Sequence, residues 1–227
     1  MKRFGFALLI GIGGMAILLS LGIWQVQRLA WKQDLLAGIE ARIAADPVDR
    51  QAEPSPEDDR YLHVTVTGSF VDSPPLSMLA SRRQTGAVHR HIAAFVAVGG
   101  RRILVDLGWT PADVALPDLP DGELTLTGNL DWPRETDSFT PEPDRDARLW
   151  YARDVPSMAE ALGTRPILLV LRDMPETDLG VTPWPVDTGG IPNDHLQYAI
   201  TWFSLAAIWG GMTLLFVRRT RRKAKEG

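Results

Sequence analysis

Two long apolar stretches near the ends of the chain dominate its pattern of hydrophobic and polar positions. Residues 4–24 and 196–217 run for 21 and 22 residues without a charged side chain. A helix needs roughly 20 mostly apolar residues to cross about 30 Å of hydrocarbon. The pattern therefore predicts a membrane protein with two transmembrane α-helices, at 4–26 and 195–217.

The helical spacing of apolar residues continues beyond the first span, as far as Ile43. Pro47 disfavours a helical conformation of the residue before it, so we expect this helix to continue to about residue 46. A cleavable signal peptide is the alternative for this segment. Its 21-residue apolar core exceeds the usual length of about 7–15 residues, and no small-x-small site follows, which favours a retained anchor.

The segment 47–194, between the two spans, alternates apolar and polar residues in the way that is typical of half-buried strands. A Gly99-Gly100 pair between two such runs predicts a hairpin, and Asp154 and Gly163 are suited to cap one short helix between them. We expect a mainly antiparallel β domain of α+β type, a small barrel or sandwich. The expected strands are 61–70, 76–81, 89–98, 101–109, 123–130 and 165–173.

Charge is distributed unevenly along the chain. Lys2 and Arg3 precede the first span and six basic residues lie in 218–227, whereas the segment between the spans carries 16 basic and 27 acidic residues. Cytoplasmic segments of membrane proteins are enriched in Lys and Arg. Residues 1–3 and the basic tail 218–227 are therefore predicted to be cytoplasmic and 47–194 periplasmic, although Arg28 and Lys32 beside the first span argue for the opposite orientation.

The rest of the composition limits the possible cellular location and the possible binding partners. No Arg- and Ser-rich presequence precedes the first span, so a bacterial inner membrane is expected, with membrane lipid as the surroundings. The chain has no cysteine, which excludes disulfides and covalent haem attachment through C-x-x-C-H. A net charge of −4 gives no basic field for nucleic acid.

Sequence motifs of enzymes are missing from the chain: it has no G-x-S-x-G, H-E-x-x-H, P-loop or G-x-G-x-x-G. The GIGG at 11–14 lies within the first span and indicates a surface for helix packing. His89 and His91 share one face of an expected strand. They could bind a metal, but an ordinary exposed strand face is favoured.

His195 lies at the start of the second span and begins a stripe of aromatic residues. On a helix, it falls within about 60° of Tyr198, Trp202 and Trp209. The first span has a corresponding stripe with three missing side chains, made of Gly11, Gly14, Leu18, Gly22 and Gln25. Two explanations stay open. The stripes could line a gap for a haem with His195 as axial ligand, or the aromatic residues could form an interfacial belt beside a His at headgroup level.

Three segments resemble the Surfeit locus protein 1 family: GIWQVQRLAWKQDLLAGIEAR, LVDLGWTP and NDHLQYAITWFSLA. The resemblance covers nearly the whole chain and implies a non-enzymatic assembly factor, a chaperone for haem–copper terminal oxidases. It further implies binding of haem a, with His195 as the iron ligand. Together with the helical stripe, this leads us to expect haem a between the two spans, with Tyr198 and Trp202 against the porphyrin. The implied partners are the oxidase catalytic subunit and haem A synthase.

One position departs from the family's pattern, and other functions stay open. Relatives usually have Arg before the Gly-Trp of the second motif, where this chain has Leu107. A haem-free membrane scaffold for oxidase assembly is the first alternative. A two-span envelope sensor or regulator unrelated to respiration is the second, and a membrane hydrolase is a remote third.

Overall fold

The computed structural model describes residues 2–49, 53–116, 118–173 and 179–226. The chain divides into two compact units. One unit, the helix unit, consists of Met1–Gly38 and Thr188–Gly227. The other, the β unit, consists of Ile39–Asp187.

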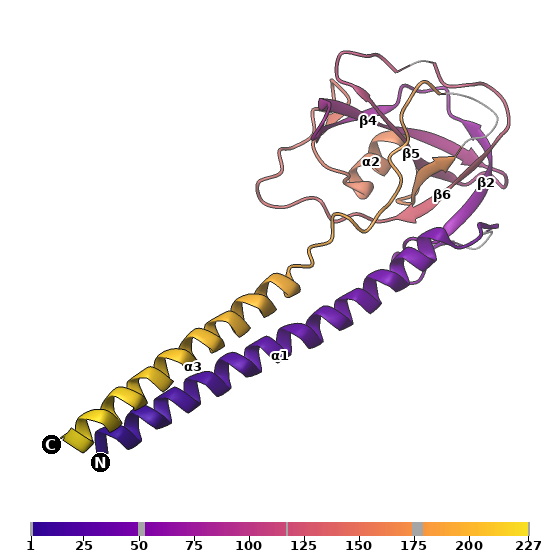
Figure 1. Ribbon diagram of the computed structural model, residues 1–227. Coiled ribbons are helices and arrows are strands. Elements are labelled where there is room, and N and C mark those ends of the chain that lie inside the picture. The colour runs from indigo at the N-terminus through magenta and orange to yellow at the C-terminus, as the bar shows by residue number, and fades with distance from the viewer. Residues whose placement is uncertain (1, 50–52, 117, 174–178, 227) are drawn as a thin grey trace. The chain divides into compact units, whose positions relative to one another are not determined.

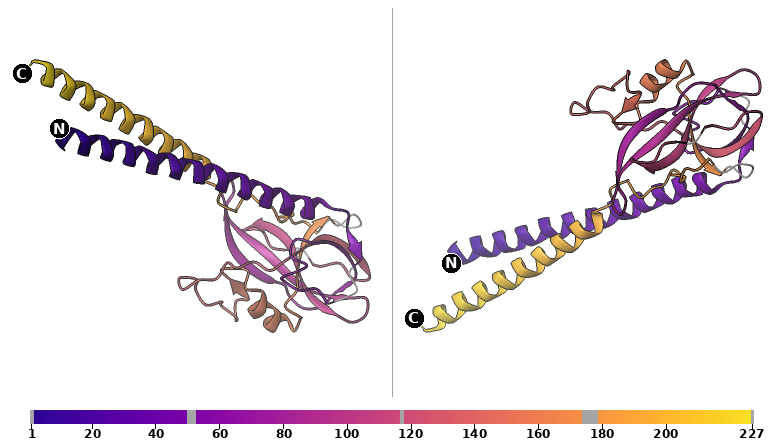
Figure 2. Two further views of the ribbon diagram at one scale, coloured as in Figure 1. Left: turned by 90° about the horizontal axis from the view of Figure 1, so that it is seen from below. Right: turned by 90° about the horizontal axis from the view of Figure 1, so that it is seen from above.

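The helix unit is an antiparallel pair formed by α1 (Lys2–Ala44) and α3 (His195–Glu226), and the two chain ends lie at the same end of the pair (Figures 1 and 2). By length and composition, both helices are able to cross a membrane. The second helix begins at His195, the residue from which the second span was expected to run. It continues to Glu226, so the basic segment expected as a tail is helical in its described part.

The last turn of α1 belongs to the β unit, and side chains of that unit bind its carbonyl groups. The final carbonyls of a helix have no partner within the helix. The Ile43 carbonyl accepts hydrogen bonds from Asn129 Nδ2 at 3.1 Å and from Arg172 Nη1 at 2.9 Å, and His63 Nδ1 donates to the Ala45 carbonyl at 2.6 Å. These contacts are formed where the helix ends, at Ala44 instead of the expected residue 46.

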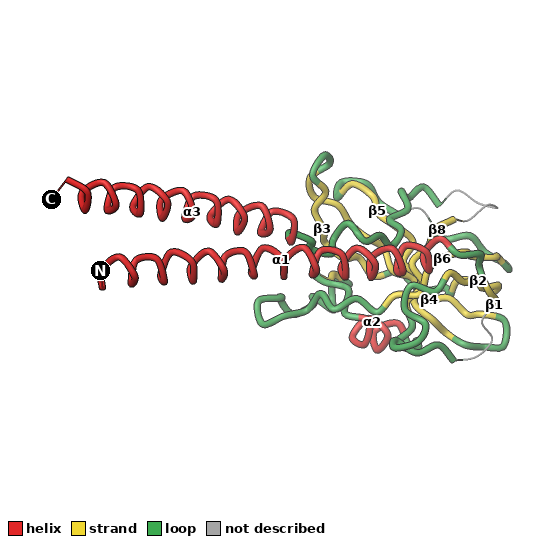
Figure 3. Tube along the Cα trace, turned by 60° about the horizontal axis from the view of Figure 1, so that its bottom comes forward, coloured by secondary structure: helices red, strands yellow, loops and turns green. Residues whose placement is uncertain are grey.

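The strands of the β unit form one mixed sheet in the order β1-β2-β6-β8-β5-β4-β3-β7, and a further β2–β4 pairing closes five of them into a ring (Figure 3). The pairings β2–β4, β2–β6, β3–β4, β4–β5 and β6–β8 are antiparallel, in line with the mainly antiparallel sheet that was expected. The pairings β1–β2, β3–β7 and β5–β8 are parallel, which makes the sheet mixed. The strands are β1 (Val48–Asp49), β2 (His63–Phe70), β3 (Leu76–Arg82), β4 (Gly86–Ala97), β5 (Arg102–Pro111), β6 (Leu124–Asp131), β7 (Leu149–Trp150) and β8 (Leu168–Asp173).

Alternate residues of the central strands fill two separate apolar clusters. Val105 and Leu169 belong to the first cluster, while their neighbours Leu104 and Leu168 belong to the second. Because successive side chains of a strand point to opposite faces, β5 and β8 are covered on both sides. The second cluster includes buried residues of α2 (Val155–Leu162), which packs on the sheet with Met158 fully buried.

The capping of α2 follows the sequence pattern. The Asp154 carboxylate accepts a hydrogen bond from the Ser157 backbone N–H, and Gly163 ends the helix in the left-handed conformation with φ of 62°. Asp is a favoured N-cap residue, and Gly adopts positive φ without a steric penalty. The predicted hairpin at Gly99-Gly100 is also present, between β4 and β5.

Candidate functional site

The three residues predicted to hold a cofactor lie on the first two turns of α3. His195 and Trp202 are half-buried, and 54% of Tyr198 is exposed. At about 100° per residue, they share one flank of the helix. The residues of α3 that are most buried against α1 are instead Ala199 and Ala206, which are each 3% exposed.

His195 is bound to the facing helix through its ring. Its Nδ1 lies 2.8 Å from Oε1 of Gln25, a residue that is 8% exposed. An amide oxygen only accepts hydrogen bonds, so in the neutral imidazole Nδ1 carries the proton and Nε2 keeps its lone pair. Nε2 makes no hydrogen bond to the described residues. The ring is thus held in the tautomer in which Nε2 is able to bind a metal.

The gap expected between the two stripes is filled by side chains of α3. A Cβ placed on Gly14 would lie 2.6 Å from the indole of Trp209, and one on Gly22 would lie 2.7 Å from the ring of Phe203. Trp209 Nε1 also donates to the Gly11 carbonyl at 3.0 Å. The glycines therefore allow close packing of the helices, as small residues do in membrane helix pairs.

Two features decide whether a haem fits here: the His195 imidazole as iron ligand and the packing of side chains between α1 and α3. The His195 imidazole is a suitable axial ligand for iron. Beside Gly14 and Gly22, the side chains of Trp209 and Phe203 occupy the space between α1 and α3. The flank that carries Tyr198 and Trp202 is the accessible side. The expected placement of haem a between the helices and haem binding itself both stay predictions.

A buried ion pair lies in the β unit next to the LVDLGWTP segment. Arg90 Nε of β4 and Asp106 Oδ2 of β5 are 2.5 Å apart, and the two side chains are 5% and 0% exposed. Asp106 Oδ1 also accepts a hydrogen bond from the Gly108 N–H at 3.2 Å. Burial raises the pKa of Asp106, and the charges of Arg90 and Arg153 oppose that shift.

The Gly108-Trp109 pair, which lies within β5, binds the segment that follows β8. Trp109 and Thr182 form a pair of backbone hydrogen bonds of 2.9 Å, and Arg90 Nη2 donates to the Trp184 carbonyl at 2.9 Å. The Arg82 guanidinium lies between two indoles, 4.8 Å from the Trp109 ring and 4.6 Å from the Trp184 ring. The motif therefore fixes the backbone of residues 182–184 to β5.

Leu107, the departure from the family pattern, is fully buried in the first apolar cluster. Arg82 of β3 and Arg90 of β4 provide the guanidinium groups beside the Gly108-Trp109 pair. Neither these arginines nor Asp106 were predicted from the sequence. A usable signal existed for Asp106, because it is the only charged residue in the apolar run 103–109. A buried lone carboxylate requires a partner.

His89 and His91, the two histidines considered as a metal pair, both lie on β4. Their rings are 6.5 Å apart, and no group of three possible metal ligands occurs in the part of the chain that the structure describes. The expectation of an exposed face was wrong for His91. It is 4% exposed, and its Nε2 lies 2.9 Å from the Thr110 hydroxyl.

We expect His91 to destabilise the β unit at acidic pH. Burial, with a smaller contribution from His89, lowers the pKa of His91 from 6.5 to about 4. The unfolded chain takes up this proton near pH 6.5 and the folded chain only near pH 4. Stability is therefore complete above pH 6.5 and decreases by up to about 3 kcal/mol as the pH falls to about 4.

Denaturant unfolding of wild type and His91→Asn at pH 7, 5.5 and 4.5 measures this difference. The variant should be less stable at pH 7 but lose less stability on acidification. His89→Asn, at the half-buried neighbouring histidine, should retain most of the wild-type loss. Equal pH dependence of wild type and His91→Asn would show that another group causes it.

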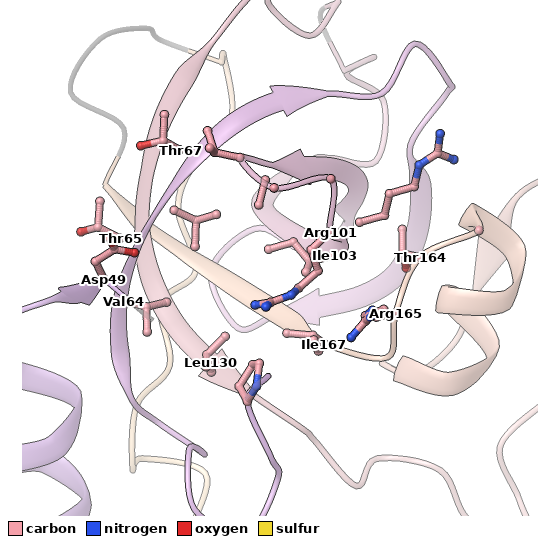
Figure 4. Close-up of a pocket in the computed structure, with 18 residues that line it drawn as sticks. Asp49, Val64, Thr65, Thr67, Arg101, Ile103, Leu130, Thr164, Arg165 and Ile167 are labelled. Carbon is pink, nitrogen blue, oxygen red and sulfur yellow. The ribbon is translucent and has the colours of Figure 1, made fainter. Parts of the chain in front are cut away.

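A cavity of about 1100 Å³ opens on the β unit beside the β4–β5 hairpin (Figure 4). Buried apolar residues of the first cluster line its floor, among them Val64, Ile103 and Ile167, and Thr65, Thr164 and three arginines contribute polar groups. Arg165 of this lining pairs with Glu53 at 2.5 Å. The lining also includes the carboxylate residue Asp49, so it carries charges of both signs.

Fold and site together define a class of protein: a mixed β unit inserted between two helices of membrane-spanning length, with a histidine oriented by the facing helix. The sequence profile of the SURF1 family matches residues 13–207. This chain belongs to the SURF1 family, as the three motifs predicted. Proteins of this family are known as oxidase assembly factors and are not enzymes, which confirms that expectation.

Individual relatives are similar along most of the chain. Surfeit locus protein 1 of Rattus norvegicus is 32% identical over 228 residues, which cover 88% of this chain and 72% of the rat protein. The human protein of the same name is 30% identical over 215 residues, or 83% and 70% of the two chains. The SURF1-like protein of Caenorhabditis elegans is 29% identical over 233 residues, or 89% and 70%.

Proposed function

We propose that this protein is an assembly factor for a haem–copper terminal oxidase of a bacterial inner membrane. The observation that carries the proposal is membership of the SURF1 family over residues 13–207, joined to two helices of spanning length. With α1 and α3 in the membrane, the positive-inside rule puts both termini in the cytoplasm. The acidic β unit is then periplasmic.

The proposed task is to hold haem a and pass it to the oxidase catalytic subunit. His195 would bind the iron through Nε2, and Tyr198 and Trp202 would pack against the macrocycle on their flank of the helix pair. Haem a supplies the iron centre of the finished oxidase when it is transferred. The partners of this step are haem A synthase as donor and the catalytic subunit as acceptor, with membrane lipid around the site.

The test is an absorption spectrum of the detergent-purified full chain, co-expressed with the enzymes of haem A synthesis. We expect wild type to carry a low-spin haem a signal and His195→Ala to lose it, because the variant removes the only proposed axial ligand. His89→Ala makes the same substitution at a histidine of the β unit and should retain the signal. Haem that is retained in full by His195→Ala would assign the ligand elsewhere.

A haem-free scaffold is the second candidate, and the packing of the helix pair favours it. Trp209 and Phe203 fill the glycine positions that a macrocycle would otherwise use. In that case wild type carries no haem, while a His195→Ala strain still assembles an oxidase with complete haem. An envelope regulator unrelated to respiration predicts instead that deletion of the gene leaves oxidase activity unchanged.

A further inference from the structure

Gln25 is a buried amide at one end of the interface between α1 and α3. Toward the chain termini, glycines face large side chains of the other helix: Gly22 meets Phe203, Gly14 meets Trp209, and Gly210 meets Met15. The one side-chain hydrogen bond between the two helices that is described there joins Trp209 Nε1 to the Gly11 carbonyl. An amide that is buried without a hydrogen-bond partner costs free energy. The side chain of Gln25 offsets this cost through its hydrogen bond with His195 Nδ1 at 2.8 Å.

The geometry points to Gln25 as a positioning residue for His195: its amide oxygen holds the proton on Nδ1 and leaves the Nε2 lone pair available to a metal such as haem iron. This inference rests on the proposed function for the identity of the metal. Ligating histidines commonly donate their other ring N–H to an oxygen acceptor, which fixes the tautomer and the ring orientation. Here that acceptor comes from the facing helix.

The orientation matters because a free imidazole has two neutral tautomers. A ring that carries its proton on Nε2 has no lone pair there and cannot bind a metal through that atom. His195 is the first residue of α3, where the preceding residues are not helical, so its own helix restrains the ring only on one side. A bond to α1 therefore supplies the missing restraint.

A purely structural clamp between the helices is the competing explanation. A clamp would stabilise the pairing of α1 and α3 without regard to which nitrogen carries the proton. Two substitutions separate these roles. Gln25→Met keeps the length and helix preference of the side chain but removes the strong acceptor, whereas Gln25→Glu keeps an oxygen acceptor. Gln27→Met changes an exposed glutamine two residues away and is the matched control.

The first readout needs no haem. Nitrogen-15 NMR of the imidazoles in the full chain in detergent, with His195→Asn used to assign the signal, reports the tautomer directly. We expect the Nδ1–H form in wild type, Gln25→Glu and Gln27→Met. Gln25→Met should show a mixture of the two tautomers. A mixture already present in wild type, or an unchanged Nδ1–H form in Gln25→Met, would overturn the inference.

The second readout is the haem a content and the low-spin EPR signal of the same proteins after co-expression with haem A synthesis. Loss of an outer-shell partner typically weakens metal affinity by about 10–100-fold. We expect a loss of this size in Gln25→Met, with recovery in Gln25→Glu and no loss in Gln27→Met. Equal haem content and EPR signals in all four proteins would contradict the positioning role.

The two readouts separate the failure of this inference from the failure of the proposed function. If wild type carries no haem, the proposed haem function fails, while the tautomer measurement still decides whether Gln25 orients His195. If wild type carries haem through His195 but Gln25→Met is unchanged in both readouts, the proposed function stands and Gln25 is only a clamp.

Discussion

Replacing Asp106 with alanine should lower the free energy of unfolding of the β unit by about 3–5 kcal/mol, because it leaves the buried Arg90 charge without its partner. Arg90 is 4% exposed, so water cannot replace the lost carboxylate. The Gly108 N–H loses an acceptor at the same time. Thermal unfolding of the full chain in detergent, followed by circular dichroism, should show a midpoint lower by about 10 °C.

Two controls separate the unpaired charge from general loss of contacts. The double variant Arg90→Met with Asp106→Leu removes both charges and should recover much of the stability, since a buried ion pair replaced by apolar residues is often close to neutral. Glu160→Ala breaks an ion pair whose side chains are 55% and 71% exposed, and should cost less than about 1 kcal/mol. A double variant as unstable as Asp106→Ala would contradict the charge argument.

The effect should extend to the backbone that leads out of the β unit. Arg90 joins Asp106 to the Trp184 carbonyl, and the same strands hold residues 182–184. Without Asp106, Arg90 is held less firmly, and its hydrogen bond to the Trp184 carbonyl weakens. Proteolysis at residues 182–187 should accordingly be faster in Asp106→Ala than in Glu160→Ala.

Local periodicity was sufficient to predict most of the elements. Alternation in 61–70 corresponds to β2, and the Asp154 and Gly163 signals bound α2. The parallel pairings were not predictable in this way. They join strands far apart in the sequence, as in β5–β8, and a pattern within one strand does not specify its neighbours.

The sequence predicted which residues of the candidate site share a face of each helix, and the structure gives the distances between the two helices. Helical spacing correctly brought His195 to the same end of the helix pair as Gln25. It could not show that Trp209 and Phe203 fill the positions opposite Gly14 and Gly22, because an angular position on a helix says nothing about how closely a partner approaches. The ion pair of Arg90 and Asp106 required the register of two strands, which the sequence does not contain.

Replacing Gly108 with alanine should lower the free energy of unfolding of the β unit by about 3–5 kcal/mol, from backbone strain and overpacking together. Gly108 has φ of +115°, which L-residues with a side chain rarely adopt. Its Cβ would lie 2.3 Å from the Thr182 carbonyl oxygen. That oxygen accepts the Trp109 N–H, so it cannot move without breaking the bridge.

Gly122→Ala provides the matched comparison. Gly122 has φ of +95°, but a Cβ there meets nothing within 4 Å, so the substitution introduces strain alone and should cost about 1–2 kcal/mol. Chemical denaturation of both variants beside wild type measures the difference, which is the contribution of the close approach to Thr182. If the two variants are equally stable, the strand and the 182–184 segment separate easily. The close packing of the Gly-Trp motif would then contribute nothing to the stability of the β unit.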